Sequence, residues 1–194
     1  MPDEASNISR RSFVQGTTVA AATSAFTIIR PELRHDQVRH RGEALSREAM
    51  AVSKKALHTL HDLEIMAVNI YKCQITSERC ELNIQLTAAM CNEMTHMQDF
   101  QTKLYEYGFK PSKMRWTYWV VGYVFGLGSR LLGSRRILKT GIWAEDKAVH
   151  HYPRLLAAAD WDDETRAIIE KDLADEFGHI ERWRTMLERP EAIC

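Results

Sequence analysis

The chain has 194 residues and is poor in glycine and proline, with nine Gly and five Pro. Turn-rich β folds need more of both residues, so their scarcity disfavours a β sandwich or barrel and favours helices. Neither sign of charge is in excess, because Lys plus Arg and Asp plus Glu each number 26. No overall field would therefore draw nucleic acid to the protein. The length suits one domain with a sizeable core.

Cysteine and long apolar runs are also scarce. The four Cys residues form no C-x-x-C pair, which excludes a zinc ribbon or a rubredoxin-type iron site. Cys91 lies two residues before a candidate ligand and is expected in the core. Two apolar runs, at 14–29 and 116–128, fall short of the roughly 20 residues that a membrane-spanning helix requires.

Two pairs of segments repeat along the chain. In the first pair, Glu, Ala, Val and Tyr recur at offsets 0, 3, 4 and 7 from Glu64 and from Glu145. In the second pair, Glu, His, an aromatic residue, Thr and Leu recur at offsets 0, 3, 7, 9 and 11 from Glu93 and from Glu176. The shift between copies is 81 residues in the first pair (64 to 145) and 83 in the second (93 to 176). This repeat predicts one helical hairpin used twice.

Each predicted hairpin carries one Glu and one Glu-x-x-His, and together these form the ligand set of a di-iron or di-manganese centre in a four-helix bundle. The six predicted metal ligands are Glu64, Glu93, His96, Glu145, Glu176 and His179. Four inward carboxylates would repel one another, whereas two divalent cations would neutralise them, and Fe²⁺ or Mn²⁺ suits such an oxygen-rich site. Three further side chains are candidates for hydrogen bonds beside the ligands: Tyr71, His151 and Tyr152.

Apolar residues at helical spacing predict four helices, at about residues 44–71, 84–107, 137–159 and 161–189. Two residues of an antiparallel hairpin lie level when they are equally distant from its turn. The midpoint of Glu64 and Glu93 lies at residues 78 and 79, and that of Glu145 and Glu176 at residues 160 and 161. Both midpoints fall in polar stretches that predict turns, so the ligands should lie level. A further Glu-x-x-His at residues 32–35 lacks the repeated neighbours and reads as a chance match.

Residues 1–45 are predicted to be a leader and linker, and residues 46–188 the helical bundle. The stretch 9–14, Ser-Arg-Arg-Ser-Phe-Val, is similar to a twin-arginine export signal, and the mildly apolar run follows it. Residues 5–31 contain Arg and Ser and no acidic residue, which is also typical of a mitochondrial presequence, although Asp3 and Glu4 disfavour that reading. A plain polar tail fits the composition as well.

Between the hairpins, residues 114–134 are dense in aromatic side chains. Four Arg residues flank the uncharged run: Arg115, Arg130, Arg135 and Arg136. Aromatic residues with flanking Arg predict an amphipathic helix that lies in a membrane surface or binds a lipophilic substrate. The alternative is an ordinary crossover helix with buried aromatics. Gly122 and Gly126 would permit close approach of a second helix.

The duplicated hairpins, the six ligands and the apolar insert resemble the demethoxyubiquinone hydroxylase family of ubiquinone biosynthesis, over about residues 46–188. Lys-Pro-Ser at 110–112, the Gly-rich stretch 125–133 and Asp175 before Glu176 are similar too. The stretch 62–64, Asp-Leu-Glu, and the stretch 143–145, Trp-Ala-Glu, depart from that family's usual Ala-Gly-Glu and Ala-Val-Glu.

This resemblance implies an all-α, ferritin-like four-helix bundle with an extra amphipathic helix between its hairpins. It implies a di-iron monooxygenase that uses O2 to hydroxylate a hydrophobic quinol taken from the membrane, with manganese as the alternative metal. With the aromatic insert, it also implies a peripheral membrane location. The resemblance favours the cytoplasmic face or the mitochondrial matrix side, whereas the twin-arginine-like leader favours an exported bacterial protein, so the compartment stays open. The electron donor stays open, because the chain has no nucleotide-binding glycine motif, and so does assembly into a homo-oligomer.

A second reading is a ferritin-like or rubrerythrin-like protein that binds iron or reduces peroxide. It needs the same six ligands but not the aromatic insert. The lack of rubredoxin-type Cys pairs excludes a full rubrerythrin.

Overall fold

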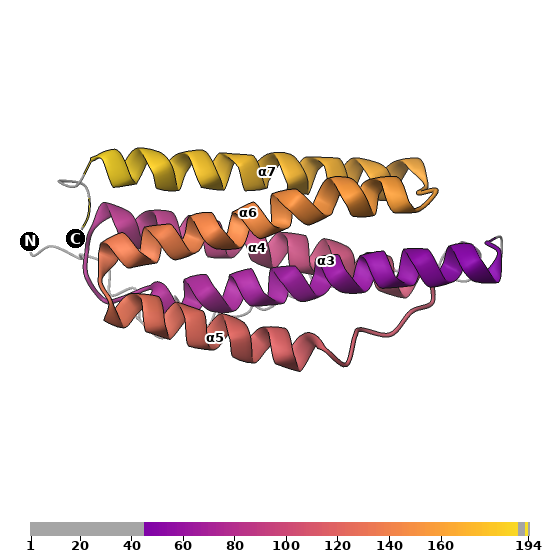
Figure 1. Ribbon diagram of the computed structural model, residues 1–194, viewed down its shortest axis with the longest axis horizontal. Helices are drawn as coiled ribbons and strands as arrows, with labels where there is room; N and C mark the ends of the chain where they lie inside the picture. Colours follow the sequence, from indigo (N-terminus) through magenta and orange to yellow (C-terminus); the bar gives the residue numbers. More distant parts are fainter. Residues whose placement is uncertain (1–44, 190–192, 194) are drawn as a thin grey trace, which may run out of the picture. The chain divides into compact units, whose positions relative to one another are not determined.

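The structure is a computed structural model that describes residues 45–189 and 193, and within these residues the chain forms five helices and no strand (Figure 1). The helices are α3 (Arg47–Gln74), α4 (Glu81–Glu106), α5 (Arg115–Leu131), α6 (Ser134–Ala158) and α7 (Asp163–Glu188). The all-α prediction is confirmed, and the helix bounds differ from the predicted ones by a few residues. The predicted leader and the 32–35 motif lie outside the described residues, and the boundary between linker and bundle stays a prediction.

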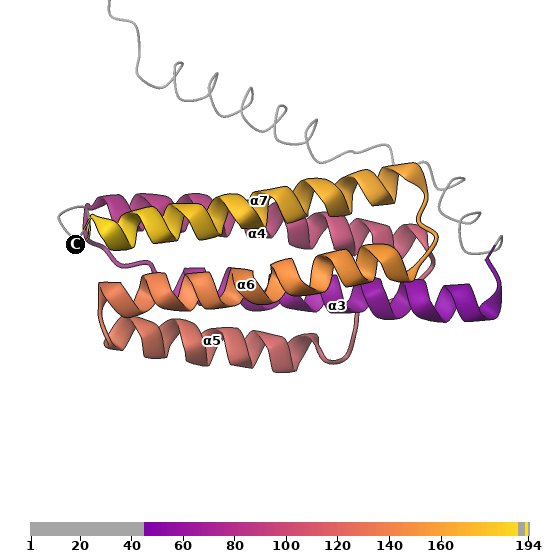
Figure 2. The ribbon, with the colours of Figure 1, turned by 45° about the horizontal axis from the view of Figure 1, so that its top comes forward.

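The four long helices form two antiparallel hairpins. Helix α3 pairs with α4, and α6 pairs with α7, while contacts between α3 and α6 and between α4 and α7 join the two hairpins. Figure 2 shows α4 beside α7 and α3 beside α6, with α5 outside the bundle against α3 and α6. The predicted bundle of two repeated hairpins with an extra helix between them is therefore confirmed.

Local signals account for the helix ends. The Ser46 side chain accepts a hydrogen bond from the backbone N–H of Ala49 (3.2 Å) at the start of α3. Asp162 caps α7 in the same way through the N–H of Thr165 (3.1 Å). Such caps satisfy backbone donors that the first helical turn leaves free. Gly133 adopts a positive φ of 89°, which allows the sharp turn from α5 into α6.

Helix α5 lies close against α3 because two of its residues are glycines. A Cβ atom at Gly122 or at Gly126 would come within 3.0 Å of the carbonyl oxygen of Met66 or of Ile70, respectively. The predicted close approach of a second helix is therefore confirmed. One face of α5 is buried on the bundle, and its opposite face leaves large apolar side chains exposed.

The apolar core has two clusters, and the polar centre lies between them along the bundle. One cluster includes Leu86 and Trp183, and the other includes Leu60 and Phe100. Cys91 was expected in the core, and this expectation is wrong, because its side chain faces solvent on α4. Glu93, two residues further along α4, points into the bundle, since residues two apart on a helix point in different directions.

Candidate metal centre

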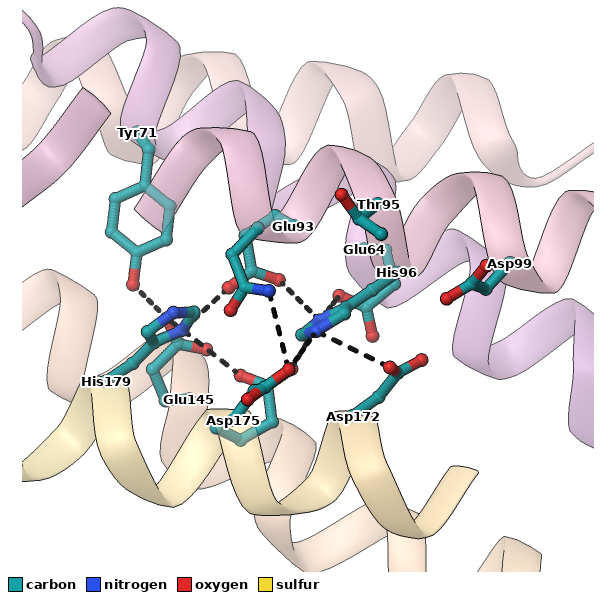
Figure 3. A network of polar contacts seen from close by, with 12 residues as sticks. Glu64, Tyr71, Glu93, Thr95, His96, Asp99, Glu145, Asp172, Asp175 and His179 are labelled. Atoms are coloured by element: carbon teal, nitrogen blue, oxygen red, sulfur yellow. Dashed lines mark hydrogen bonds and ion pairs between the residues drawn. The ribbon is translucent and has the colours of Figure 1, made fainter. Parts of the chain in front are cut away.

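The six predicted ligands come together in the interior of the bundle. Figure 3 labels five of them: Glu64, Glu93, His96, Glu145 and His179. Helices α3 and α6 each supply one Glu, and α4 and α7 each supply a Glu and a His three residues apart on one helix face. All six side chains are buried, and Glu93, His96 and Glu176 have exposed fractions of 0%. The equal distances from the two turns, read from the sequence, are therefore matched by a common level in the bundle.

The ligand atoms form two overlapping groups, and within each group they lie within 4.8 Å of one another. The first group is Glu64, Glu93, His96 and Glu176; the second is Glu93, Glu145, Glu176 and His179. Glu93 and Glu176 belong to both groups. This arrangement offers two neighbouring cation positions with two shared carboxylates between them, and a separate Glu and His at each end.

The imidazoles aim the same nitrogen at these positions. The Nδ1 atom of His96 lies 3.5 Å from Glu93 and 3.3 Å from Glu176. The Nδ1 atom of His179 lies 2.8 Å from Glu93 Oε1 and 3.4 Å from Glu145 Oε1. In the described part of the chain, neither Nδ1 atom makes a hydrogen bond, and neither do the carboxylate oxygens of Glu93 and Glu176.

These orphaned atoms test whether metal ions would fit. A buried polar atom without a partner costs about 1–3 kcal/mol, and more when it is charged. The donor atoms approach one another closely without hydrogen-bond geometry, so they converge on points between them. Carboxylate oxygens and imidazole nitrogens are suitable donors for iron or manganese. The residues present therefore fit two divalent cations, and six orphaned atoms would gain ligand bonds.

Burial and crowding of like charges shift the proton affinities of the centre. Burial raises the pKa of Glu64 well above its usual 4.5, and the charges of Glu176 and Glu93 raise it further. Burial and the charge of Glu176 raise the pKa of Glu145 to about 8. Without cations, the centre therefore keeps carboxylate protons at a pH where exposed carboxyls have lost theirs.

Burial and the neighbouring carboxylates shift the pKa of the two imidazoles in opposite directions. Burial by itself would lower the pKa of His96 and of His179. The adjoining carboxylates outweigh that effect and raise both pKa values to about 12. Two cations at the centre would replace these protons, because a metal ligand must be deprotonated.

Two tyrosines link the hairpins crosswise. Tyr152 of α6 donates a hydrogen bond to Glu64 Oε1 of α3 (2.6 Å), and Tyr71 of α3 donates one to Glu145 Oε1 of α6. Burial raises the pKa of both phenols well above 10, and the partner carboxylates raise it further, so both stay neutral donors. The interpretation of Tyr71 and Tyr152 as hydrogen-bond partners beside the ligands agrees with these contacts.

His151 does not join the centre. Among the described residues, no hydrogen bond or ion pair connects it to any of the six predicted ligands. It follows Glu145 by six residues, and on a helix this offset turns a side chain well away from the ligand's direction. Its proposed place beside the ligands is therefore not matched by the structure.

Two carboxylates of α7 lie at the centre but were not predicted to have a role in it. The Nε2 atom of His96 hydrogen-bonds Asp175 Oδ2 (3.1 Å) and lies 3.6 Å from Asp172 Oδ1 (Figure 3). Lys171 Nζ holds Asp172 at 2.9 Å. Their spacing was a usable signal, because positions four and one before Glu176 lie on the side of α7 that faces α4.

Helices that enclose two overlapping groups of carboxylate and imidazole side chains define the class: ferritin-like four-helix bundles with a buried Glu and His centre. Comparison with known protein families matches residues 51–186 to the family described as ubiquinone biosynthesis protein COQ7. The match covers more than half of the chain, so the chain belongs to this family of ubiquinone biosynthesis hydroxylases and is an enzyme. The predicted resemblance is thus confirmed. Comparison with curated proteins gives no match.

Proposed function

We propose that the protein is a di-iron monooxygenase that uses O2 to hydroxylate a hydrophobic quinol. The observation that carries this proposal is the pair of buried ligand groups that share Glu93 and Glu176. Glu64 and His96 would hold one ion, and Glu145 and His179 the other. When bound, an iron pair supplies the oxygen chemistry that these side chains lack.

The protein side chains supply geometry and exclude water. The ligands lie between two apolar clusters, so bulk solvent does not surround the reacting region. The hydroxyl groups of Tyr71 and Tyr152 each fix one oxygen of a terminal Glu, which leaves that carboxylate a preferred orientation. The role of the chain in the reaction is therefore to hold the ligands in place and to keep water away from them.

Helix α5 supports delivery of the quinol from a membrane surface. Its exposed apolar side chains include Trp116 (65% exposed), Val124 and Leu131 (78%). Apolar area of this kind on one helix, with Arg residues at its ends, is typical of a helix that lies in the interface of a bilayer. No helix among the described residues is long and apolar enough to cross a membrane. Attachment to the membrane surface is accordingly part of this proposal.

The opposite face of α5 packs against the apolar cluster on one side of the centre. Tyr118 and Val121 pack against the apolar cluster that contains Leu63 and Tyr71. Leu63 precedes Glu64 in the chain, and Tyr71 donates a hydrogen bond to Glu145. A flat, apolar quinol ring that enters beside α5 would meet apolar side chains before it reaches the ligands. This arrangement favours a lipophilic substrate over a soluble one.

Turnover of a defined substrate tests the proposal. The full chain is loaded with Fe²⁺ without oxygen, and then receives a demethoxyquinol, a chemical reductant and isotopically labelled O2. We expect a hydroxylated quinol that carries one labelled oxygen atom, with the second atom released as water. Iron binding without any quinol product would contradict the proposal.

The same experiment addresses the alternative function. An iron-storing or peroxide-reducing protein would oxidise Fe²⁺ or consume peroxide and leave the quinol unchanged. The exposed apolar face of α5 disfavours this reading, because neither activity needs a lipophilic surface. Exchange of the exposed Glu181 for Gln on α7 serves as the control variant and should leave quinol turnover unchanged.

A further inference from the structure

The internal repeat relates the two ends of the metal centre but does not make them equal. Under the 83-residue shift that carries Glu93 to Glu176, Asp175 corresponds to Asn92 and Asp172 corresponds to Ala89. One copy of the motif therefore carries two carboxylates at positions where the other copy carries an amide and a methyl group. The ligands themselves are the same in both copies.

The contacts of the two imidazoles differ accordingly. His96 Nε2, the nitrogen turned away from the ligand group, hydrogen-bonds Asp175 (3.1 Å), and the buried Asp172 lies 3.6 Å away. Among the residues that the structure describes, the ion pairs of His179 with carboxylates are made by Nδ1 and not by Nε2. Asn92 points its amide at Asp175 Oδ2 instead (3.4 Å). Only the imidazole of α4 is thus oriented by a carboxylate.

Lys171 keeps these carboxylates in place. Its ammonium group lies 2.9 Å from Asp172 and 3.6 Å from Asp175. The corresponding residue of the first copy is Ala88, so this anchor too is confined to one end of the centre. Two carboxylates and a lysine therefore build a fixed support behind His96, and residues 45–189 supply no equivalent of it behind His179.

A second difference acts on the other terminal carboxylate. Trp183 Nε1 donates a hydrogen bond to Tyr71 Oη (3.0 Å), and Tyr71 in turn donates to Glu145. Phe100 stands at the position equivalent to Trp183 and meets Tyr152 only edge to face, with ring centroids 6.0 Å apart. Hydrogen bonds in series strengthen one another, so more electron density is drawn from Glu145 than from Glu64.

We infer that the two cation positions are unequal, and that the position of Glu64 and His96 binds a divalent cation more tightly than that of Glu145 and His179. A carboxylate on the far nitrogen of a ligating imidazole fixes its tautomer and raises its basicity, and its loss typically costs about 10–100-fold in metal affinity. Asp175 is the positioning residue for His96. This inference rests on the proposed metal centre.

Stepwise metal binding tests the inference. The full chain is titrated with Co²⁺ in the absence of oxygen, and absorption bands of the bound ion report each step. We expect two steps of unequal affinity in the unaltered protein. Glu64→Ala should remove the tighter step and Glu145→Ala the weaker one. Asp175→Asn should weaken the tighter step about 10–100-fold and leave the weaker one unchanged.

A charge-neutral exchange provides the sharper variant. Asn92→Asp combined with Asp175→Asn keeps the net charge and removes the carboxylate that hydrogen-bonds His96 Nε2, so the tighter step should weaken although the charge of the protein is unchanged. Glu170→Gln, an exposed change on α7, is the control for charge alone. Two equal steps in the unaltered protein, or equal weakening of both steps by Asp175→Asn, would overturn the inference and leave the proposed function intact. Absence of any Co²⁺ binding would overturn both.

Discussion

Between α3, α4, α6 and α7 the protein buries the six predicted ligands, whereas on the outer face of α5 it exposes large aromatic and aliphatic side chains. Each region reverses the usual distribution of polar and apolar residues, and a buried charge or an exposed apolar patch is the informative departure. Under the proposed function, cations would bind the interior, and a lipid or quinol would cover the outer face of α5.

Removal of a shared carboxylate should have the largest effect on this comparison. Glu176 belongs to both ligand groups, so Glu176→Ala should weaken binding of both cations by at least about 100-fold and abolish quinol turnover. Metal analysis of the purified protein and a turnover assay check this. Full metal content with retained activity would show that Glu176 is not a metal ligand and would contradict the proposed centre. Glu181→Gln on the same helix is the control.

The exposed face of α5 is tested next. Replacing Trp116 and Leu131 by Ser should weaken binding to liposomes by roughly tenfold or more per side chain, because burial of a large apolar side chain contributes about 1.5–3 kcal/mol. Ile84→Ser is the matched control, because this exposed Ile (62%) lies on α4, away from α5. Unchanged sedimentation of the α5 variant with liposomes would show that this face does not contact the membrane.

The inner face of α5 should be sensitive to a single methyl group. Gly122→Ala forces a Cβ against the Met66 carbonyl and Asn69, which should lower the free energy of unfolding by about 1–3 kcal/mol. Gly128→Ala lies on the same helix in open space and should raise it slightly, by about 0.5–1 kcal/mol. Denaturant unfolding compares the two. Equal changes in both variants would mean that α5 does not pack tightly on α3.

The pH dependence of stability gives the smallest expected effect and distinguishes the metal-free from the metal-bound interior. The folded pKa of Glu145, about 8, exceeds the usual 4.5, so its stabilising contribution is present below pH 4.5 and is lost as pH rises to about 8. The contributions of His96 and His179 are likewise lost from pH 6.5 upward. Metal binding strengthens over the same range, because its ligands must lose protons.

The increase in melting temperature on addition of Co²⁺ should therefore be larger at pH 8 than at pH 6. Thermal unfolding with and without the ion measures this difference. An increase that is the same at both pH values would contradict the assignment of raised pKa values to the centre. The Glu176→Ala variant, which lacks a shared ligand, should show little increase at either pH.

Much of the fold could be predicted because its signals are local. Helix periodicity, the Asp162 cap and the positive φ of Gly108 (76°), which follows the end of α4, depend on residues close in the chain. The ligand set could also be predicted from the sequence. Glu93 and His96 share a face of any helix, and the distance of each ligand from its turn sets its height along the bundle. The predicted place of His151 beside the ligands was not matched for the same reason, because a side chain six positions after Glu145 on a helix points away from the direction of Glu145.

The sequence alone determined which residues face one another along each hairpin, because i, i+3 spacing and distance from a turn are properties of a single helix pair. Only the tertiary structure decided which carboxylates are shared and which Tyr donates to which Glu. It also decided that Asp175 of α7 hydrogen-bonds His96 of α4 rather than a residue of its own helix. It also decided that α5 buries one face and exposes the other. These contacts depend on the rotation and stagger of helices from different hairpins, and side-chain packing between distant segments sets both.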